Sequence, residues 1–346
     1  MTTINDATAA RSATDVLAAC RDLGTPALRA AVDSMPGSMR HITGYHLGWW
    51  DADGEPTDAD SGKALRPALV LCAAEAVGGD PAEAIPAAVA VELVHNFSLL
   101  HDDVIDGDLT RRHRPTAWTV FGTSAAILAG DSALTLAMDV LAAAGHPAAE
   151  PATRLLAACV QELIDGQGND IAFEARADVT MVECLRMVEA KTGALLAASC
   201  TLGALFGRAD QARAGRLGAF GRHLGVAFQS ADDLLGVWGV PAVTGKPVHS
   251  DLVSHKKSLP VVAALTSGTQ AGRDLADLYA GDTPLTDEQA RRAAGLIDLA
   301  GGRTWAEQRA EDELAAALNE LAMADPVPRA AAELGALARL ATRRDH

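Results

Sequence analysis

Apolar residues recur at intervals of three and four along most of this chain, and clusters of Gly or Pro separate the periodic stretches. This spacing gathers apolar side chains on one face of an α-helix, whereas a half-buried strand needs strict alternation. We find no sustained alternation in the sequence. The pattern therefore predicts an all-α protein, with about ten to twelve helices of roughly 12 to 28 residues.

The composition agrees with a helical protein. Aromatic residues make up only 4% of the 346 residues, while Ala and Leu are abundant. Helices favour Ala and Leu, whereas sheets draw on β-branched and aromatic residues. Because no repeat, low-complexity linker or shift of composition marks a boundary, we expect one all-helical domain over residues 1–346, frayed up to about Thr14.

Charge and hydropathy exclude several classes of protein. The 29 Lys and Arg against 45 Asp and Glu give a net charge of -16, which disfavours binding of nucleic acid. Because the chain has no run of about 18 uncharged apolar residues, we expect no stable membrane insertion. The N-terminus lacks a secretion signal and the five scattered cysteines form no C-x-x-C pair, so we expect a cytoplasmic protein with buried, reduced cysteines.

An acidic cluster ends a helix that the pattern predicts over residues 89–110. Asp102 and Asp106 lie four residues apart, so their carboxylates project from one face about a turn apart. His95 shares that face two turns earlier, while Asp103 is rotated by about 100°. Carboxylates oppose the dipole at a helix C-terminus, but hard oxygen ligands suit Mg²⁺ that also binds substrate phosphates. A solvated acidic helix end is the alternative.

The sequence becomes basic directly after this cluster, at Arg111, Arg112, His113 and Arg114. Guanidinium groups bind phosphate oxygens in a bidentate geometry. A metal-binding cluster beside guanidinium groups therefore suits a diphosphate or triphosphate substrate. A solvated basic loop explains this segment equally well when it is taken alone.

A second acidic pair, Asp232 and Asp233, follows another apolar helical stretch, with Gln229 on the face of Asp232. We predict a second metal-binding surface here, although Gly236 stands where a third aspartate would repeat the first cluster. The next segment suits a flap that brings ammonium groups over a phosphate, and also an ordinary surface loop. It contains Gly245, Lys246, Pro247, Lys256 and Lys257.

Two further basic positions stand in helical patterns. Lys191, followed by Thr192, interrupts the apolar stretch 181–206, where a buried ammonium needs an anionic partner unless it reaches solvent. Lys63 and Arg66 begin another helix, whose N-terminal N–H groups favour an anion. Both positions add to the expected phosphate-binding residues.

Together these segments resemble the trans-isoprenyl diphosphate synthases, also called the polyprenyl synthetase family. The matching segments occur in the family's order over residues 62–260. They are GKALRP (62–67), His95, DDVID (102–106), RR (111–112), KT (191–192), FQSADD (228–233) and GK (245–246) with Lys256. One DDxxD alone is a weak signal, whereas the ordered set is specific.

The resemblance implies the isoprenoid synthase fold, a large helical bundle around a central cavity, usually in a homodimer. It implies that Asp102, Asp106 and Asp232 hold Mg²⁺, three ions with substrate bound, and that Asp103, Asp233 and Lys191 assist catalysis. The residues implied for the allylic diphosphate are Arg111, Lys191, Thr192, Gln229, Lys246 and Lys256. Those implied for isopentenyl diphosphate are Lys63, Arg66, His95 and Arg112.

The implied reaction joins these two diphosphates. Cationic groups stabilise the departing diphosphate, and the double bond of isopentenyl diphosphate attacks the allylic cation in a dry cavity. In the family, the residues four and five places before the first aspartate set chain length, and here they are Ser98 and Phe97. This pair resembles synthases that make geranylgeranyl diphosphate, while farnesyl or longer products, and core packing of Phe97, stay open.

Two other functions fit parts of the pattern. A class I terpene cyclase needs no isopentenyl diphosphate site, which the intact Lys63, Arg66, His95 and Arg112 disfavour. A non-catalytic partner subunit would be expected to lose aspartates of DDVID. Gly236, Val240 and His249 depart from the family pattern, but we expect activity to survive, because the first aspartate of the second motif makes most of its metal contact in the family.

Overall fold

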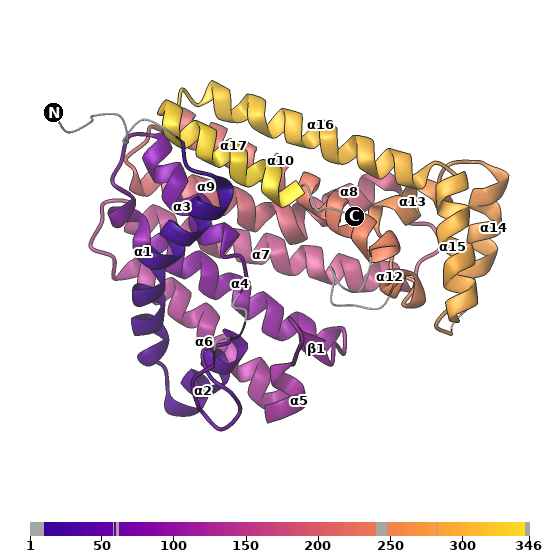
Figure 1. The fold of residues 1–346 in the computed structure, drawn as a ribbon, viewed down its shortest axis with the longest axis horizontal. Helices are drawn as coiled ribbons and strands as arrows, with labels where there is room; N and C mark the ends of the chain where they lie inside the picture. Colours follow the sequence, from indigo (N-terminus) through magenta and orange to yellow (C-terminus); the bar gives the residue numbers. More distant parts are fainter. Residues whose placement is uncertain (1–9, 58, 60–61, 240–247, 282, 343–346) are drawn as a thin grey trace. The chain divides into compact units, whose positions relative to one another are not determined.

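The computed structural model describes residues 10–57, 59, 62–239, 248–281 and 283–342. Helices dominate these residues (Figure 1), and the all-α prediction is confirmed. The strands of the described residues are the two-residue β1 (Thr110–Arg111) and β2 (Arg114–Pro115), with an isolated bridge between Trp50 and Pro56. The contacts divide the chain into two compact units, each built from three separate segments.

Unit 1 comprises Met1–Val160, Ala198–Gly218 and Leu321–Leu337, as far as these are described. Its complete helices are α1 (Ala13–Asp33), α2 (Gly37–His46), α3 (Leu65–Ala76), the 3₁₀ helix η1 (Pro81–Ala84), α4 (Ile85–Ile105), α5 (Ala117–Phe121) and α6 (Thr123–Ala142). Five longer helices belong to it in part: α7 (Ala149–Glu174), α9 (Ala194–Phe206), α10 (Gln211–Trp238), α16 (Gly302–Met323) and α17 (Pro328–Thr342).

Helices α4 and α6 pack against each other and are apolar enough to cross a membrane by length and composition alone. In the segment 81–105, which includes α4, 67% of the most apolar window is buried, as in the core helix of a globular protein. In α6 only 33% is buried, and Ile127 and Leu128 are exposed beside Asp131. Within the single chain, α6 therefore presents an exposed apolar surface.

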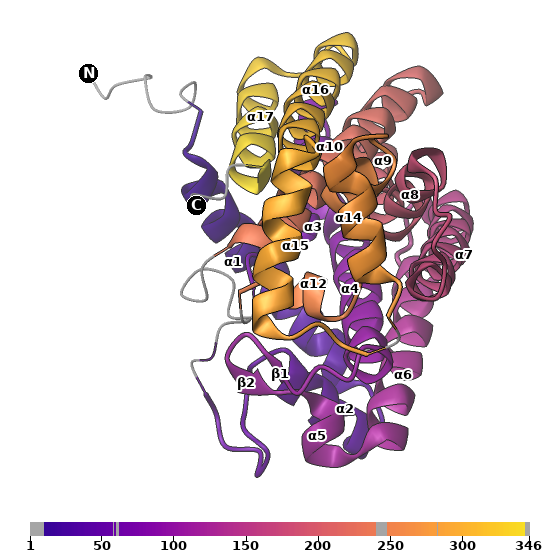
Figure 2. The ribbon, with the colours of Figure 1, turned by 90° about the vertical axis from the view of Figure 1, so that its right-hand side faces the viewer.

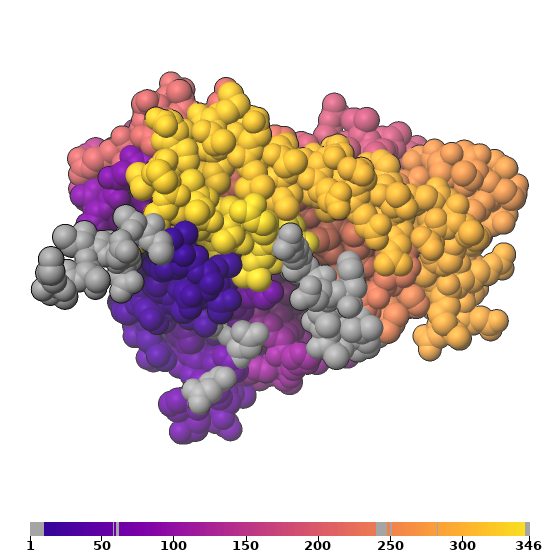
Figure 3. Space-filling model, turned by 45° about the horizontal axis from the view of Figure 1, so that its top comes forward, coloured from indigo at the N-terminus to yellow at the C-terminus, as the bar shows by residue number. Residues whose placement is uncertain are grey.

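The first described residues are tied to the C-terminal helix. Ser12 caps α1 by accepting a hydrogen bond from the Asp15 backbone N–H at 3.2 Å. The guanidinium of Arg11 donates to both carboxylate oxygens of Glu333 on α17, at 2.9 and 2.7 Å. The N-terminal segment, in indigo, accordingly lies beside the yellow helix α17 (Figures 1 and 3). The predicted fraying up to Thr14 is therefore wrong for residues 11–14, while residues 1–9 lie outside the described residues.

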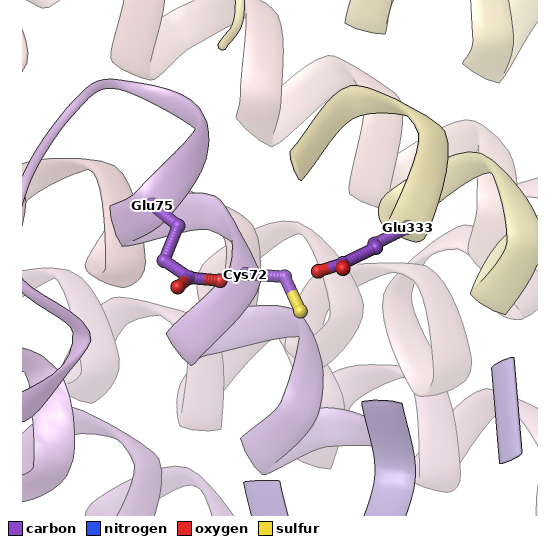
Figure 4. A group of neighbouring side chains, drawn as sticks. All are labelled: Cys72, Glu75 and Glu333. Atoms are coloured by element: carbon purple, nitrogen blue, oxygen red, sulfur yellow. The ribbon is translucent and has the colours of Figure 1, made fainter. Parts of the chain in front are cut away.

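Glu333 belongs to a buried polar group with Cys72 and Glu75, whose ligand atoms lie within 4.8 Å of one another (Figure 4). Arg329 donates to Glu75 at 2.9 Å, and Arg11 lies 3.6 Å from the same carboxylate. Because guanidinium groups already neutralise both carboxylates, we interpret this group as an ion-pair cluster rather than a metal site. All five cysteines are buried and free, as predicted.

Unit 2 comprises Gln161–Ala197, Ala219–Glu320 and Ala338–His346, as far as these are described. Its complete helices are α8 (Met181–Val188), the π-helical turn η2 (Glu189–Gly193), α12 (Ser250–Val253), α13 (Leu259–Leu265), α14 (Gln270–Tyr279) and α15 (Asp287–Leu299). Helices α14 and α15 lie side by side (Figures 1 and 2). They enclose an apolar core with Val237, Leu252 and Val261.

The apolar stretch 181–206 is continuous helix but not uniform α-helix, because η2 connects α8 to α9. A π turn adds one residue to the helical turn and occurs often at functional sites. Two glycines of neighbouring helices make room for it. A Cβ at Gly166 would lie 2.8 Å from the Cα of Lys191, and one at Gly225 would lie 2.5 Å from the Cα of Gly193. Lys191 and Thr192 stand in this turn.

Candidate active site

The first acidic cluster lies at the C-terminal end of α4. The helix ends at Ile105, earlier than predicted, because Gly107 adopts a φ of +67° that stops it. Asp106 keeps a helical backbone and its N–H donates to the carbonyl of Asp102 at 2.8 Å, so the predicted spacing of one turn holds. Asp102 is half-buried and Asp106 is exposed. Two carboxylates so placed form an oxygen donor set that suits a hard cation such as Mg²⁺.

Asp103 differs from these two residues because it is buried, with only 1% of its side chain exposed. It accepts a hydrogen bond from Nε of Arg111 at 2.7 Å, which forms an ion pair across the end of α4. Arg111 is thus anchored by Asp103, a partner that the sequence did not reveal. The pair fixes the β1–β2 hairpin against α4.

The residues expected to bind isopentenyl diphosphate come together in unit 1. Nη1 of Arg66 on α3 lies 3.2 Å from Nε2 of His95 on α4. Arg112 occupies the hairpin turn with a φ of +49°, and its Nη2 would lie 2.6 Å from a Cβ at Gly62. Lys63 follows Gly62 and is exposed. Burial lowers the pKa of His95, and Arg66 and Arg112 lower it further. Such crowding of cationic groups is relieved by an anion.

Lys191 has the anionic partner that its burial demands. Its Nζ donates to Oδ2 of Asp170 on α7 at 2.5 Å, and the two side chains are 23% and 14% exposed. The predicted anionic partner is therefore present, while the Lys191 side chain keeps part of its surface exposed. Sequence reasoning missed Asp170, although its position four residues after the close-contact Gly166 places both on one face of α7.

A chain of hydrogen bonds links Thr192 to the second acidic pair. Thr192 Oγ1 donates to Gln229 Oε1, Gln229 Nε2 donates to Asp233 Oδ1, and the N–H of Leu259 donates to Asp233 Oδ2, each at 2.8 Å. Gln229 thus bridges Thr192 and Asp233. Burial raises the pKa of Asp233 to about 7, despite the opposing charge of Lys256. The buried Asp233 thus connects Gln229 on α10 to the start of α13 at Leu259.

Lys256 lies among carboxylates of unit 2. Burial lowers its pKa, but Asp251, Asp170, Asp233 and Asp232 together outweigh burial and raise the pKa well above its usual value. The ammonium therefore stays charged. A small cavity of about 20 Å³ is lined by Asp170, Lys191, Thr192, Gln229, Asp233 and Lys256, among others. Sequence reasoning missed Asp251, while Gly245, Lys246 and Val240 lie outside the described residues.

Gly236, the position of the missing third aspartate, contacts Asp251. A side chain at residue 236 would collide with this carboxylate, whose Cγ lies 2.6 Å from the ideal Cβ position. His249 has a φ of +63°, and its Nδ1 lies 2.5 Å from the carbonyl oxygen of Val237. These contacts dock the segment around Asp251 onto the end of α10.

The two residues expected to set chain length lie on different faces of α4. Ser98 is about 40° from Asp102 around the helix, and Phe97 about 140°. Phe97 is buried and packs edge-on against His101 at 4.7 Å, and His101 contacts the carbonyl of Ile127 on α6. Ser98 is half-buried, and its Oγ donates to the carbonyl of His95. The packing places Phe97 in the contact between α4 and α6.

Comparison with known proteins gives a consistent result. A model of the family described as polyprenyl synthetase matches residues 57–297. A (2E,6E)-farnesyl diphosphate synthase of Mycobacterium tuberculosis is 48% identical over 326 residues, which cover 93% of this chain and 91% of that protein. A geranylgeranyl diphosphate synthase of the same species is 45% identical over 322 residues, covering 92% and 91%.

The fold gives the same answer. The crystal structure of a polyprenyl synthetase from Streptomyces coelicolor matches with a TM-score of 0.91 and 47% identity, over 95% of this chain and 99% of that one. A geranylgeranyl pyrophosphate synthetase from Pyrococcus horikoshii matches with a TM-score of 0.84 and 31% identity, over 96% and 99%. This chain therefore has the isoprenoid synthase fold and belongs to the polyprenyl synthetase family of trans-prenyltransferases.

Proposed function

We propose that this prenyltransferase condenses isopentenyl diphosphate with an allylic diphosphate and releases geranylgeranyl diphosphate. The observation that carries the proposal is the half-buried group of Arg66, His95 and Arg112, in which two guanidinium groups flank an imidazole next to the exposed Lys63. A terpene cyclase, which binds one allylic diphosphate, has no use for this second anion-binding group.

We propose that Asp102 and Asp106 of unit 1 and Asp232 of unit 2 hold Mg²⁺. Their oxygen donors fit this ion, and Asp102 and Asp106 lie one turn apart on the same end of α4. Bound Mg²⁺ would supply positive charge to the diphosphate leaving group. Asp103 and Asp233 are buried and engaged elsewhere, so they support the neighbouring carboxylates instead.

The residues of the chain have separate tasks in this proposal. Lys191 and Lys256 bind the allylic diphosphate and stabilise the negative charge that develops as it departs, with Thr192 and Gln229 as polar neighbours. Asp170 holds the ammonium of Lys191 in place before substrate arrives. The apolar residues around α4 exclude water from the allylic cation. The departing diphosphate accepts the final proton, so no side-chain base is needed.

The twenty-carbon product rests on Ser98, a small residue one helical turn before Asp102. A small side chain leaves room for a growing isoprenoid chain, whereas a bulky one would stop it. The relatives named above include both a farnesyl and a geranylgeranyl diphosphate synthase.

The test is direct incubation of the purified protein and Mg²⁺ with isopentenyl diphosphate and, in turn, dimethylallyl, geranyl and farnesyl diphosphate. We expect geranylgeranyl diphosphate by mass spectrometry, and no turnover without isopentenyl diphosphate. A hydrocarbon formed from an allylic diphosphate alone would contradict the condensation. Farnesyl diphosphate as the final product would contradict only the chain length.

We also propose that the protein is a homodimer that uses α6 as its interface. Support comes from the exposed apolar side chains of α6, including Ile127 and Leu128, on a helix whose most apolar window is only 33% buried. Asp131 and Asp139 stand on the same helix, and these charges suit a protein partner better than lipid. A second copy of the chain would cover this surface by symmetry.

A further inference from the structure

His46 is the last residue of α2, and its ring lies among the basic residues that follow α4. Its Nε2 is buried and makes no hydrogen bond within the part of the chain that the structure describes. The ring lines a cavity of about 20 Å³ together with Arg111, Arg112 and Arg114. A buried imidazole without a hydrogen-bond partner is costly, and a ligand that accepts a hydrogen bond would remove the cost.

The surroundings of His46 carry excess positive charge. Four guanidinium groups and two buried carboxylates lie here. The guanidinium groups belong to Arg66, Arg111, Arg112 and Arg114, and the carboxylates to Glu92 and Asp103. Arg111 is held by Asp103, and Arg114 donates to the carbonyls of Tyr45 and Trp50. Guanidinium groups gathered in this way suit a diphosphate, because each can bind phosphate oxygens in a bidentate geometry.

Asn96 on α4 is a polar neighbour of His46. Its amide nitrogen is engaged by Glu92, through the carbonyl at 2.8 Å and Oε1 at 3.1 Å. This fixes the amide oxygen, which has no hydrogen bond of its own among the described residues, on the side that interacts with His46. Asn96 directly follows His95 on α4, so neighbouring positions of one helix contact both imidazole-bearing residues of this group.

The imidazole is neutral when the site holds no anion. Burial lowers the pKa of His46 to about 3, and Arg111, Arg112 and Arg114 add to this effect. Arg111 and Arg112 lower the pKa of both His46 and His95, so the two rings share one group of guanidinium neighbours. A neutral imidazole adds a hydrogen-bond donor to the group without adding to its cationic repulsion.

We propose that His46 is a further residue of the isopentenyl diphosphate site, where its ring donates a hydrogen bond to the diphosphate. The inference rests on the proposed function and extends its binding residues from α3, α4 and the hairpin to α2. His46 binds substrate and takes no part in the chemical step. Its loss should therefore weaken the binding of one substrate and leave the other unaffected.

The experiment compares His46→Leu with wild type in steady-state kinetics and in calorimetric binding of isopentenyl diphosphate alone. We expect the KM and the Kd for isopentenyl diphosphate to rise about tenfold, as for one hydrogen bond to a charged group. The KM for the allylic diphosphate should stay within about twofold. An unchanged KM and Kd for isopentenyl diphosphate in a folded His46→Leu protein would overturn the inference.

Two conservative variants separate a binding role from a structural one. The amide nitrogen of His46→Asn can replace Nδ1 and that of His46→Gln can replace Nε2, so one of them should recover most of the affinity. Equal losses for both substrates in all three variants would indicate a structural role and contradict the proposal. The control is His41→Gln on the same helix, whose ring contacts the carbonyl of Ala52 instead and should leave both KM values unchanged.

Failure of this inference differs from failure of the proposed function. A wild-type protein that does not consume isopentenyl diphosphate would overturn the function and, with it, the inference. A wild-type protein that is active, with a His46→Leu variant of normal affinity, would remove His46 from the site and leave the condensation intact.

Discussion

The carboxylate of Asp251 lies where a side chain at residue 236 would have to go, with its Cγ 2.6 Å from the Cβ position of Gly236. Asp251 also contributes most among the carboxylates that keep Lys256 charged. The family pattern places an aspartate at 236. In this chain, a carboxylate from a later segment fills the same space and carries the same charge.

An exchange of the two residues tests this relationship. Gly236→Asp should destabilise the protein by about 1–3 kcal/mol because of overpacking, with added repulsion between the two carboxylates. The double variant Gly236→Asp/Asp251→Gly should recover most of the stability and activity. The measurements are urea denaturation and turnover. A single Gly236→Asp variant as stable as wild type would show that Asp251 does not constrain residue 236.

The ion pair of Lys191 with Asp170 leads to a prediction about the chemical step. Lys191→Met should lower kcat by at least about a hundredfold, because a preorganised charge at the leaving group is lost. Its KM for isopentenyl diphosphate should change little. Lys63→Met is the contrasting variant, since it should raise that KM and largely spare kcat. If both variants gave the same kinetic pattern, the division of tasks would be wrong.

Ser98 gives a prediction about product length. Ser98→Phe should shift the main product from twenty to fifteen carbons, because a bulky ring would occupy the space below Asp102. The comparison is Phe97→Ala. Since Phe97 packs against His101 toward α6, that variant should cost about 3 kcal/mol of stability with little change in product. Mass spectrometry of the products decides between them, and a shift only in Phe97→Ala would reverse the assignment.

Glu333 should make stability depend on acid pH. Burial raises its pKa, but the hydrogen bonds from Arg11 outweigh burial and hold the pKa below 4.5. A lowered carboxyl pKa stabilises the fold above pH 4.5, and this contribution is lost as pH falls through the lower folded value. Glu333→Gln should thus cost about 2 kcal/mol at pH 7, and this loss should shrink below pH 4.5.

Urea denaturation of wild type and Glu333→Gln across this pH range provides the measurement. Glu75→Gln is the comparison variant, because Glu75 is 19% exposed, lies 3.6 Å from the same Arg11 and accepts a hydrogen bond from Arg329 at 2.9 Å. Because Glu75 is more exposed than Glu333, Glu75→Gln should lower the free energy of unfolding by less than Glu333→Gln does. A loss for Glu333→Gln that is the same at every pH would contradict the assigned pKa.

The exposed face of α6 leads to a prediction about assembly. Leu128→Glu should convert the dimer to a monomer, because a buried charge at an apolar interface is expensive. Val182→Glu on α8 is the control, since Val182 is similarly exposed, at 58% against 55% for Leu128. Light scattering after size-exclusion chromatography gives the mass. An unchanged dimer in Leu128→Glu would place the interface elsewhere.

The helical class and most of the candidate site followed from local patterns. The spacing of Asp102 and Asp106 depends only on helix geometry, and the structure keeps it. The demand of Lys191 for an anion follows from burial alone. These features were predictable because each depends on residues within one or two helical turns.

Asp170, Asp251 and His46 were not predicted, because nothing near each of them in the sequence marks it as functional. Each has its important neighbour in another segment of the chain. Asp170 contacts Lys191, Asp251 contacts Gly236, and His46 lies beside the hairpin at Arg112. The π turn at Lys191 is of the same kind. It depends on Gly166 and Gly225 in other helices. Their lack of a side chain lets these helices approach the π turn closely, which is visible only in the packed structure.

The path of the chain through its two units has a consequence for how the protein is made. Unit 1 needs the segment Leu321–Leu337, and Arg11 reaches its partner Glu333 only across 322 residues. A ribosome must therefore synthesise almost the whole polypeptide before the first unit can close. During that interval helices α1 to α6 expose apolar surface that the finished unit buries. We therefore expect the nascent chain to need chaperones to avoid aggregation, even if the folded protein is stable.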